Sequence, residues 1–203
     1  GMNIGRINTK YGDIEEFERV SKMLKELKCE ILFDIKGLKY MDYLRGKKFD
    51  WLAVSYAETP GQINNIRKLF SRKIKIISKI ETMKGINNLD KLLKVSDGIM
   101  VARGDLGNNI RLENVPIFQK KIIKKSNNEN KFVITATEML LSMVNSKSPE
   151  RAEVSDIANA VLDGSDAVML SEETALGKYP ALVVKTMKRI IEATRRNARY
   201  LEN

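Results

Sequence analysis

The most constraining feature of this sequence is a regular alternation of short, continuously apolar runs with amphipathic helical segments. The runs are rich in Ile, Val and Phe and lack the polar alternation of a half-exposed antiparallel sheet, so they are typical of parallel strands covered on both faces. Helical spacing of apolar residues follows most of them, and the last helix is expected over residues 180–201. We expect strands at residues 3–8, 30–35, 51–56, 75–80, 98–103, 132–137 and 167–170.

Two α/β architectures fit this alternation, an open doubly wound sheet and a (β/α)8 barrel. An open sheet usually carries a glycine-rich phosphate loop after its first strand. Neither G-x-G-x-x-G nor G-x-x-x-x-G-K-[ST] occurs in the chain. A barrel instead places its chemistry at the carboxyl ends of many strands. The sequence therefore predicts one domain over residues 1–203, a truncated (β/α)8 TIM-type barrel with about seven parallel strands.

Polar residues gather at the predicted strand ends. Residues at i and i+2 of a strand point to the same face, so Lys79 and Glu81 form a same-side pair. Ordinary loop-entry charges would explain one such pair, but the repetition on several strands favours a functional site. The other polar strand ends are Arg6 with Asn8, Asp34 with Lys36, Arg103-Gly104-Asp105, Thr137-Glu138, and Ser171-Glu172-Glu173-Thr174.

The composition excludes several kinds of chemistry. The chain has no histidine and a single cysteine, Cys29. A Ser-His-Asp or Cys-His triad, a histidine base and a zinc site built on imidazole or several thiolates are therefore excluded. A bound metal would be a hard cation such as Mg²⁺ or Mn²⁺. Glu81 and Asp105 end neighbouring predicted strands and could share it, with Lys79 beside a developing oxyanion.

The remaining candidate groups suit a small acidic substrate. Gly104 allows a close approach of the backbone to a ligand, and Arg6 offers a bidentate fork for phosphate. Thr137 and Ser171 supply hydroxyl groups. Together these groups indicate a phosphorylated or carboxylated substrate that is chelated to Mg²⁺ and passes through an enolate.

Charge and hydropathy restrict the partners and the location. Lys and Arg number 36 against 26 Asp and Glu, a net charge of +10 that permits nucleic-acid binding. The basic residues are scattered, however, and their densest cluster, at residues 120–125, fits a solvated helix face. Residues 1–13 show no secretory signal, and no apolar run is long enough to cross a membrane. We expect a cytoplasmic protein with a small-molecule substrate and no nucleic-acid or membrane partner.

Several segments resemble the pyruvate kinase family in residues and in order. The resemblance covers essentially the whole chain and implies a barrel that transfers a phosphoryl group between phosphoenolpyruvate and ADP in glycolysis, with Mg²⁺ (or Mn²⁺) as cofactor. The segments are G-M-N-I-G-R-I-N (1–8), F-D-I-K-G (33–37), K-I-I-S-K-I-E (75–81), D-G-I-M-V-A-R-G-D-L-G (97–107), A-T-E-M-L (136–140), R-A-E-V-S-D-I-A-N-A-V-L-D-G (151–164) and M-L-S-E-E-T-A (169–175).

The resemblance also implies roles for individual residues. Lys79 would stabilise the enolate and the transferring phosphoryl group, with Arg6 on the phosphate and Thr137 near the proton-transfer face. The implied ligands of the divalent metal are Glu81 and Asp105, and those of a monovalent cation are Asn8 and Asp34. The implied substrate-binding residues are Arg103, Gly104, Asp105, Thr137 and Ser171.

The chain departs from the family on the nucleotide side. Only residues 37–49 separate the second and third predicted strands, too few for the family's lid domain. We expect the lid, the C-terminal domain and the first barrel strand of the family to be absent. Lys10 replaces a hydroxyl ligand of the monovalent cation, and Lys39 falls where potassium-independent members carry Lys. An ammonium from Lys10 or Lys39 would replace that cation, which we expect not to be required.

Three functions stay open at this point. The chain is a minimal pyruvate kinase, a nucleotide-independent enzyme that enolises or decarboxylates pyruvate-like acids, or a degenerate non-catalytic paralogue that serves as a binding or structural subunit. Missing lid and nucleotide-side residues leave turnover with ADP undecided. The incomplete barrel also predicts a homo-oligomer or an association with a longer pyruvate kinase, because an open sheet edge is prone to pairing.

Overall fold

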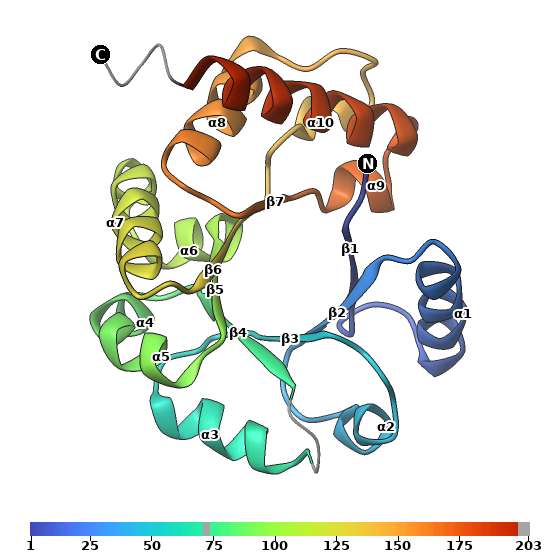
Figure 1. Ribbon diagram of the computed structural model, residues 1–203, viewed down its shortest axis with the longest axis vertical. Coiled ribbons are helices and arrows are strands. Elements are labelled where there is room, and N and C mark those ends of the chain that lie inside the picture. The colour runs from blue at the N-terminus through green and yellow to red at the C-terminus, as the bar shows by residue number, and fades with distance from the viewer. Residues whose placement is uncertain (71–73, 199–203) are drawn as a thin grey trace. The chain divides into compact units, whose positions relative to one another are not determined.

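The computed structural model describes residues 1–70 and 74–198. The chain divides into two compact units, an N-terminal unit of residues 2–100 and a C-terminal unit of residue 1 and residues from 101 onward. Within each unit strands and helices alternate along the chain (Figure 1). The predicted α/β fold is confirmed, with seven strands in the described part of the chain.

The N-terminal unit is built on a parallel sheet whose carboxyl ends share one edge. Its strands pair in chain order, and the register places Asn8 beside Asp34. Its helices lie on the outer side of the strands (Figure 1). The strands are β1 (Ile4–Asn8), β2 (Glu30–Ile35), β3 (Trp51–Val54), β4 (Lys75–Ile80) and, at the unit's end, β5 (Gly98–Ala102); the helices are α1 (Ile14–Glu26), α2 (Met41–Arg45), α3 (Pro60–Lys68), α4 (Met83–Asn87) and α5 (Leu89–Val95).

Aromatic packing holds the helices of this unit to its sheet. Helix α1 starts where the Asp13 carboxylate accepts the backbone N–H of Glu16 at 2.9 Å, a helix N-cap. The helix then buries Phe17 against Phe33 of β2, with ring centroids 6.2 Å apart in an edge-to-face arrangement. Phe33 in turn packs on Phe49, at 5.3 Å. These contacts fix β2, and therefore its carboxyl end, relative to the unit's outer layer.

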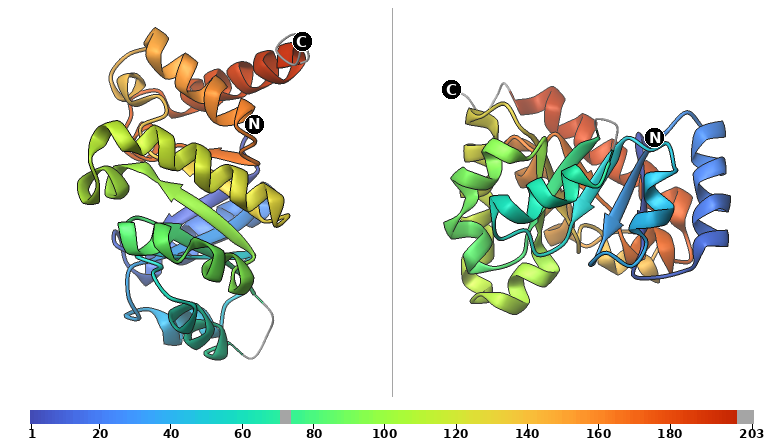
Figure 2. Two further views of the ribbon diagram at one scale, coloured as in Figure 1. Left: turned by 90° about the vertical axis from the view of Figure 1, so that its left-hand side faces the viewer. Right: turned by 90° about the horizontal axis from the view of Figure 1, so that it is seen from below.

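The C-terminal unit joins two parallel strands, β6 and β7, to a pair of helices. Helices α8 and α10 lie side by side (Figure 2) and enclose an apolar core that includes Met139, Ile157 and Val183. The elements are α6 (Arg103–Asn109), η1 (Leu112–Asn114), α7 (Val115–Asn128), β6 (Phe132–Ala136), η2 (Leu141–Val144), α8 (Arg151–Leu162), β7 (Ala167–Met169), α9 (Glu172–Ala175) and α10 (Pro180–Asn197).

Four strands end earlier than the sequence predicted. The third and sixth stop because Tyr56 and Thr137 adopt positive φ values of 50° and 74°, which extended backbone does not permit. The fifth stops because Arg103 is already the first residue of α6. The seventh ends at Met169 and not at residue 170. Two of these corrections move a candidate residue: Arg103 becomes the first residue of α6, and Thr137 lies in the turn after β6.

The ends of helices α8 and α10 lie in the C-terminal unit, and the sequence predicted one of them. Helix α8 ends at Leu162, and Gly164 takes a φ of 99°, as expected of a glycine that stops a helix. Helix α10 ends at Asn197, and the last residues of its predicted span lie outside the described part of the chain. No described helix combines the length and the apolar character required to cross a membrane.

Candidate active site

Five side chains of the N-terminal unit meet at the carboxyl ends of β1 to β4. This group, the Lys79 cluster, consists of Arg6, Asp34, Ser55, Lys79 and Glu81. The Lys79 ammonium lies 3.2 and 3.1 Å from the two Asp34 carboxylate oxygens, 3.0 Å from Ser55 Oγ and 2.9 Å from Glu81 Oε1. Arg6 binds Asp34 Oδ2 through Nε at 2.9 Å and Nη2 at 2.7 Å. The predicted same-face pair of Lys79 and Glu81 is confirmed.

Burial and a backbone contact hold Glu81 in place. Its side chain is 1% exposed, and Oε2 accepts the backbone N–H of Tyr56 at 2.6 Å. Tyr56 can direct this N–H because its backbone is in the left-handed region, uncommon for a residue other than glycine. A carboxylate that is already fixed loses little further side-chain freedom when it binds a ligand, so less conformational entropy opposes binding.

The Lys79 cluster is electrically balanced, with two cations against two carboxylates. Burial by itself lowers the pKa of Lys79, but Coulombic attraction to Asp34 and Glu81, together with hydrogen bonds to both, outweighs it. The pKa of Lys79 is therefore raised above its ordinary value of 10.5. Lys79 carries a positive charge at neutral pH and can stabilise an oxyanion but cannot act as a base.

We predict that the stabilisation supplied by Lys79 disappears at high pH. Because its pKa is higher in the folded than in the unfolded chain, this contribution is complete below pH 10.5 and is lost as the pH rises through the folded pKa. The difference in unfolding free energy between wild type and Lys79→Met, measured in urea, should be constant between about pH 8 and pH 10 and shrink above that range. A difference that does not change with pH would contradict this.

A second group, in the C-terminal unit, consists of Arg103, Gly104, Thr137 and Asp156, and we call it the Thr137 cluster. Arg103 Nη1 binds both Asp156 carboxylate oxygens, at 2.7 and 2.6 Å, and Nη2 donates to the Thr137 carbonyl at 2.6 Å. Thr137 Oγ1 accepts the backbone N–H of Gly104 at 2.8 Å. The structure thus brings together three of the residues that the sequence indicated as substrate-binding.

The backbone of Thr137 is strained. Thr137 and Glu138 have consecutive positive φ values of 74° and 53°. For a β-branched residue such a conformation is a true outlier, and it persists only where the surroundings enforce it. The hydrogen bonds from Arg103 to the carbonyls of Thr137 and Glu138, at 2.6 and 3.3 Å, provide that constraint. Arg103 is therefore committed to holding this turn, a role the sequence analysis did not foresee.

The donor set at these strand ends fits a hard divalent cation. Glu81 belongs to the N-terminal unit. Asp105 belongs to the C-terminal unit, where it is exposed in the first turn of α6. An ion shared by the two carboxylates therefore stays a prediction. The described residues contain no group of three or more Asp, Glu or Cys side chains arranged around one ion. Mg²⁺ is commonly held by one or two carboxylates plus water and substrate oxygens. At Glu81 Oε1 such an ion would compete with Lys79.

Ser171 and the residues predicted to bind a monovalent cation differ in their hydrogen-bond partners. Ser171 Oγ is buried and has no hydrogen-bond partner among the described residues, which suits a ligand-binding hydroxyl. Asn8 Oδ1 accepts the Lys10 backbone N–H at 3.1 Å, and the Asp34 carboxylate is bound by Arg6 and Lys79. The Lys10 and Lys39 ammonium groups lie over the rings of Tyr11 and Tyr40, at 5.1 and 4.7 Å from the ring centroids.

Sequence reasoning missed three residues that build or support these clusters, namely Ser55, Tyr56 and Asp156. Ser55 and Tyr56 directly follow β3, so a search of every strand end would have found them. Asp156 lies on α8, away from any strand end, whereas Glu173, on α9, belongs to the polar strand end at residues 171–174. Glu173 is fully buried and accepts the backbone N–H groups of Leu140 and Ser171, at 3.0 and 2.7 Å. The role of Asp156 has no local signal, because its partner Arg103 is 53 residues away in sequence.

Comparison with known proteins gives a consistent result. The family described as "Pyruvate kinase, barrel domain" matches residues 39–184. The chain is 48% identical to a pyruvate kinase of Clostridium perfringens over 74% of its length and 52% identical to one of Bacillus licheniformis over 70%. It is also 48% identical to a pyruvate kinase of Staphylococcus haemolyticus, over 84% of its length. These matches cover only 33%, 25% and 34% of the relatives, so the chain spans between a quarter and about a third of their length.

Proposed function

The chain belongs to the pyruvate kinase family, and on that basis we propose that it transfers a phosphoryl group between phosphoenolpyruvate and ADP. The observation that carries the proposal is the Lys79 cluster: a buried, charged ammonium held between Asp34 and Glu81 at the carboxyl ends of parallel strands. Phosphoryl transfer depends on positioning and positive charge more than on a covalent catalyst, and this cluster supplies both.

In the proposed reaction the bond between phosphorus and the enol oxygen breaks, and a bond from phosphorus to a terminal ADP oxygen forms. The enolate left behind takes up a proton at its methylene carbon and becomes pyruvate. Lys79 would stabilise the enolate oxygen, because its charge is fixed near neutral pH. Two N–H groups of Arg6 donate to the Asp34 carboxylate, and its other N–H groups would donate to the phosphate. Thr137 would border the carbon that is protonated.

We propose that Glu81 and Asp105 hold one Mg²⁺ ion and that Gly104 and Ser171 help bind the substrate carboxylate. The bound ion would neutralise charge on the transferring phosphoryl group. The fixed carboxylate of Glu81 and the Ser171 hydroxyl, which has no partner among the described residues, support these assignments. We further propose that the chain works in the cytoplasm as one barrel-type domain, as a homo-oligomer or with a longer pyruvate kinase.

The test is a coupled assay for pyruvate formed from phosphoenolpyruvate and ADP. We expect activity with Mg²⁺, none after chelation, and no difference between potassium and a bulky organic cation at equal ionic strength. Glu81→Gln should lower kcat by about 10²-fold or more, whereas Glu113→Gln, at an exposed carboxylate of η1, should not. Pyruvate formed without ADP would identify the nucleotide-independent enzyme instead. Binding of phosphoenolpyruvate without turnover would identify the non-catalytic paralogue.

A further inference from the structure

Beside the Lys79 cluster, within the N-terminal unit, the loop after β3 is tied to the loop after β4. Each loop offers a carboxylate to the other. Glu81, from the loop after β4, accepts the backbone N–H of Tyr56 at 2.6 Å. Glu58, from the loop after β3, accepts the side-chain hydroxyl of Thr82 at 2.9 Å. The two hydrogen bonds therefore join the same two turns, one in each direction.

Glu58 makes further contacts with the loop after β4 and with α4. Its Oε2 atom lies 3.0 Å from the Lys84 ammonium, and its backbone carbonyl accepts a side-chain N–H of Asn88 at 3.0 Å. The Thr82 hydroxyl that donates to Glu58 also accepts the backbone N–H of Gly85, at 3.1 Å, as the N-cap of α4. The Glu58 carboxylate is therefore anchored to the start of a helix as well as to an exposed lysine.

The loop after β3 also approaches α4 closely. A Cβ atom at Gly85 would lie 2.9 Å from the Ala57 carbonyl oxygen, too close for the backbone to stay where it is. Gly85 is buried, and only a residue without a side chain leaves room for this approach. The Ala57 N–H donates to the Lys79 carbonyl at 3.2 Å. The segment that follows Tyr56 is thus held by its backbone, by the Glu58 side chain and by the fit against Gly85.

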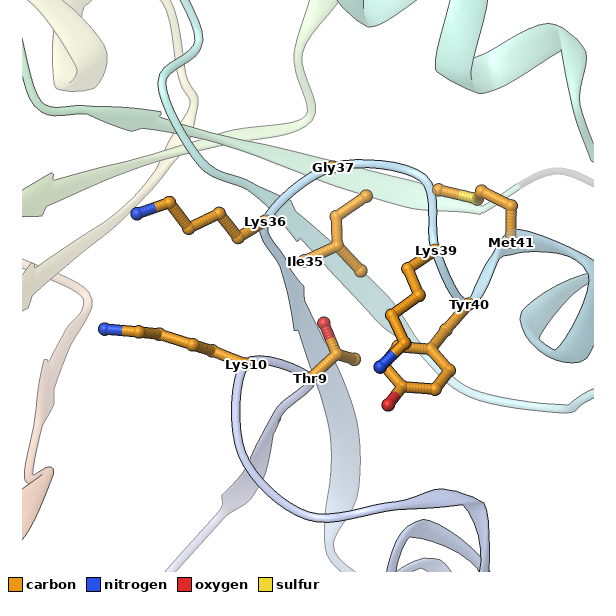
Figure 3. Close-up of a pocket in the computed structure, with 8 residues that line it drawn as sticks. All are labelled: Thr9, Lys10, Ile35, Lys36, Gly37, Lys39, Tyr40 and Met41. Carbon is orange, nitrogen blue, oxygen red and sulfur yellow. The ribbon is translucent and has the colours of Figure 1, made fainter.

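Tyr56 depends on this support because its backbone is in the left-handed region, with a φ of 50°. A residue other than glycine keeps that conformation only where its surroundings enforce it. The Tyr56 ring has a separate contact, because the Lys36 ammonium lies over it, 5.2 Å from the ring centroid. Lys36 is exposed and borders a small cavity between the loops after β1 and β2, where it extends away from Tyr40 (Figure 3). A lysine on a flexible stem can follow the ring, so it does not fix the backbone of the turn.

We propose that Glu58 is a positioning residue that holds the turn at Tyr56 and thereby keeps the Glu81 carboxylate in place. This role rests on the proposed function, in which Glu81 binds the divalent cation. Without the Glu58 side chain the turn can relax toward a negative φ, and the Tyr56 N–H then turns away from Glu81 Oε2. The freed carboxylate loses side-chain freedom when it binds the cation, which weakens binding. Glu58 acts through Tyr56 and is not itself a catalytic residue.

The test is amide hydrogen exchange of the whole chain, followed in ¹⁵N–¹H spectra, in which the Tyr56 amide reports its bond to Glu81. In Glu58→Ala we expect exchange at Tyr56 to be at least about tenfold faster than in wild type, because the bond opens more often. Amides of β4 should exchange at the wild-type rate, since the change is local. Glu58→Gln should behave much as wild type does, because its amide oxygen can still accept the Thr82 hydroxyl. Glu26→Ala, at an exposed carboxylate of α1, is the matched control and should change nothing.

Two further variants separate the parts of this contact. Gly85→Ala should accelerate exchange at Tyr56 while Glu58 is kept, because the added methyl group displaces the Ala57 carbonyl. Lys84→Met should leave exchange at Tyr56 unchanged, because the Lys84 side chain is 62% exposed and an ion pair of that kind contributes little.

The proposed function adds two readouts. Binding of Mn²⁺, measured by electron paramagnetic resonance, should weaken about tenfold in Glu58→Ala, which corresponds to about 1.4 kcal/mol. In the pyruvate assay kcat should fall while KM for phosphoenolpyruvate changes little, and Glu58→Gln should restore most of both losses. If the wild type neither binds Mn²⁺ nor forms pyruvate, the proposed function is wrong, and exchange at Tyr56 still decides the role of Glu58.

Unchanged exchange at Tyr56 in Glu58→Ala would overturn the proposal. An equal acceleration throughout β4 would also overturn it, because Glu58 would then stabilise the fold as a whole without positioning Glu81. The same holds for an unchanged Mn²⁺ affinity in Glu58→Ala when the wild type binds the ion.

Discussion

Replacing Lys79 by methionine is expected to lower the unfolding free energy by about 3 kcal/mol, because it leaves the buried carboxylates of Asp34 and Glu81 short of a positive partner. This loss lies at the lower end of the range expected when a buried ion pair is broken, because Arg6 still binds Asp34. Urea unfolding monitored by circular dichroism measures it. Lys94→Met, at an exposed lysine of α5, should change stability by less than about 0.5 kcal/mol.

A second variant separates lost charge balance from lost packing. In Lys79→Met/Glu81→Gln a neutral amide replaces the Glu81 carboxylate, which would otherwise have lost its partner. The amide oxygen can still accept the Tyr56 N–H. The double variant should therefore be more stable than the sum of the two single changes predicts, by about 1 kcal/mol or more. Strict additivity would show that Lys79 and Glu81 are not coupled. If the proposed function holds, Lys79→Met should also lower kcat for pyruvate formation by about 10²- to 10³-fold.

Replacing Arg103 by lysine should be costly although the charge is kept. One ammonium cannot hold the Asp156 carboxylate and the Thr137 carbonyl together as the planar guanidinium does. We expect a loss of about 2 kcal/mol in unfolding free energy, lower than for a fully buried pair because the Asp156 side chain is 34% exposed. Arg111→Lys, at an exposed arginine, is the matched control and should be neutral.

The same variant tests whether Arg103 positions Thr137. Without the guanidinium the strained turn at residues 137–138 should relax and the hydrogen bond from Gly104 N–H to Thr137 Oγ1 should weaken. The amide resonance of Gly104 in a ¹⁵N–¹H spectrum should therefore shift, while amides of the N-terminal unit such as Gly85 should not. In the pyruvate assay we expect kcat to fall more than KM changes. An unmoved Gly104 resonance in Arg103→Lys would contradict the positioning role.

Much of the architecture was predictable because it depends on local patterns. The continuous apolar runs predicted β2 and β4 with the bounds that the structure shows, since a strand buried on both faces needs apolar residues throughout. The two-residue period of a strand likewise predicted that Lys79 and Glu81 share a face. Both inferences use neighbours in sequence, and neighbours in sequence remain neighbours in the fold.

The partners across strands were decided by the tertiary structure. Arg6 meets Asp34 because β1 and β2 pair in a particular register, and the sequence alone does not specify that register. Ser55 joins Lys79 for the same reason. Arg103, which the resemblance implies as a substrate-binding residue, pairs in the fold with Asp156, which is 53 residues away in sequence.

For this chain, the sequence by itself determined the strands, the charged groups at their carboxyl ends and the family. The tertiary structure decided which of those groups neutralise one another and which hold a strained turn. The physical reason is that hydrophobic periodicity acts over a few residues along the chain, whereas hydrogen bonds and ion pairs depend on distances of about 3 Å set by the packing of distant segments.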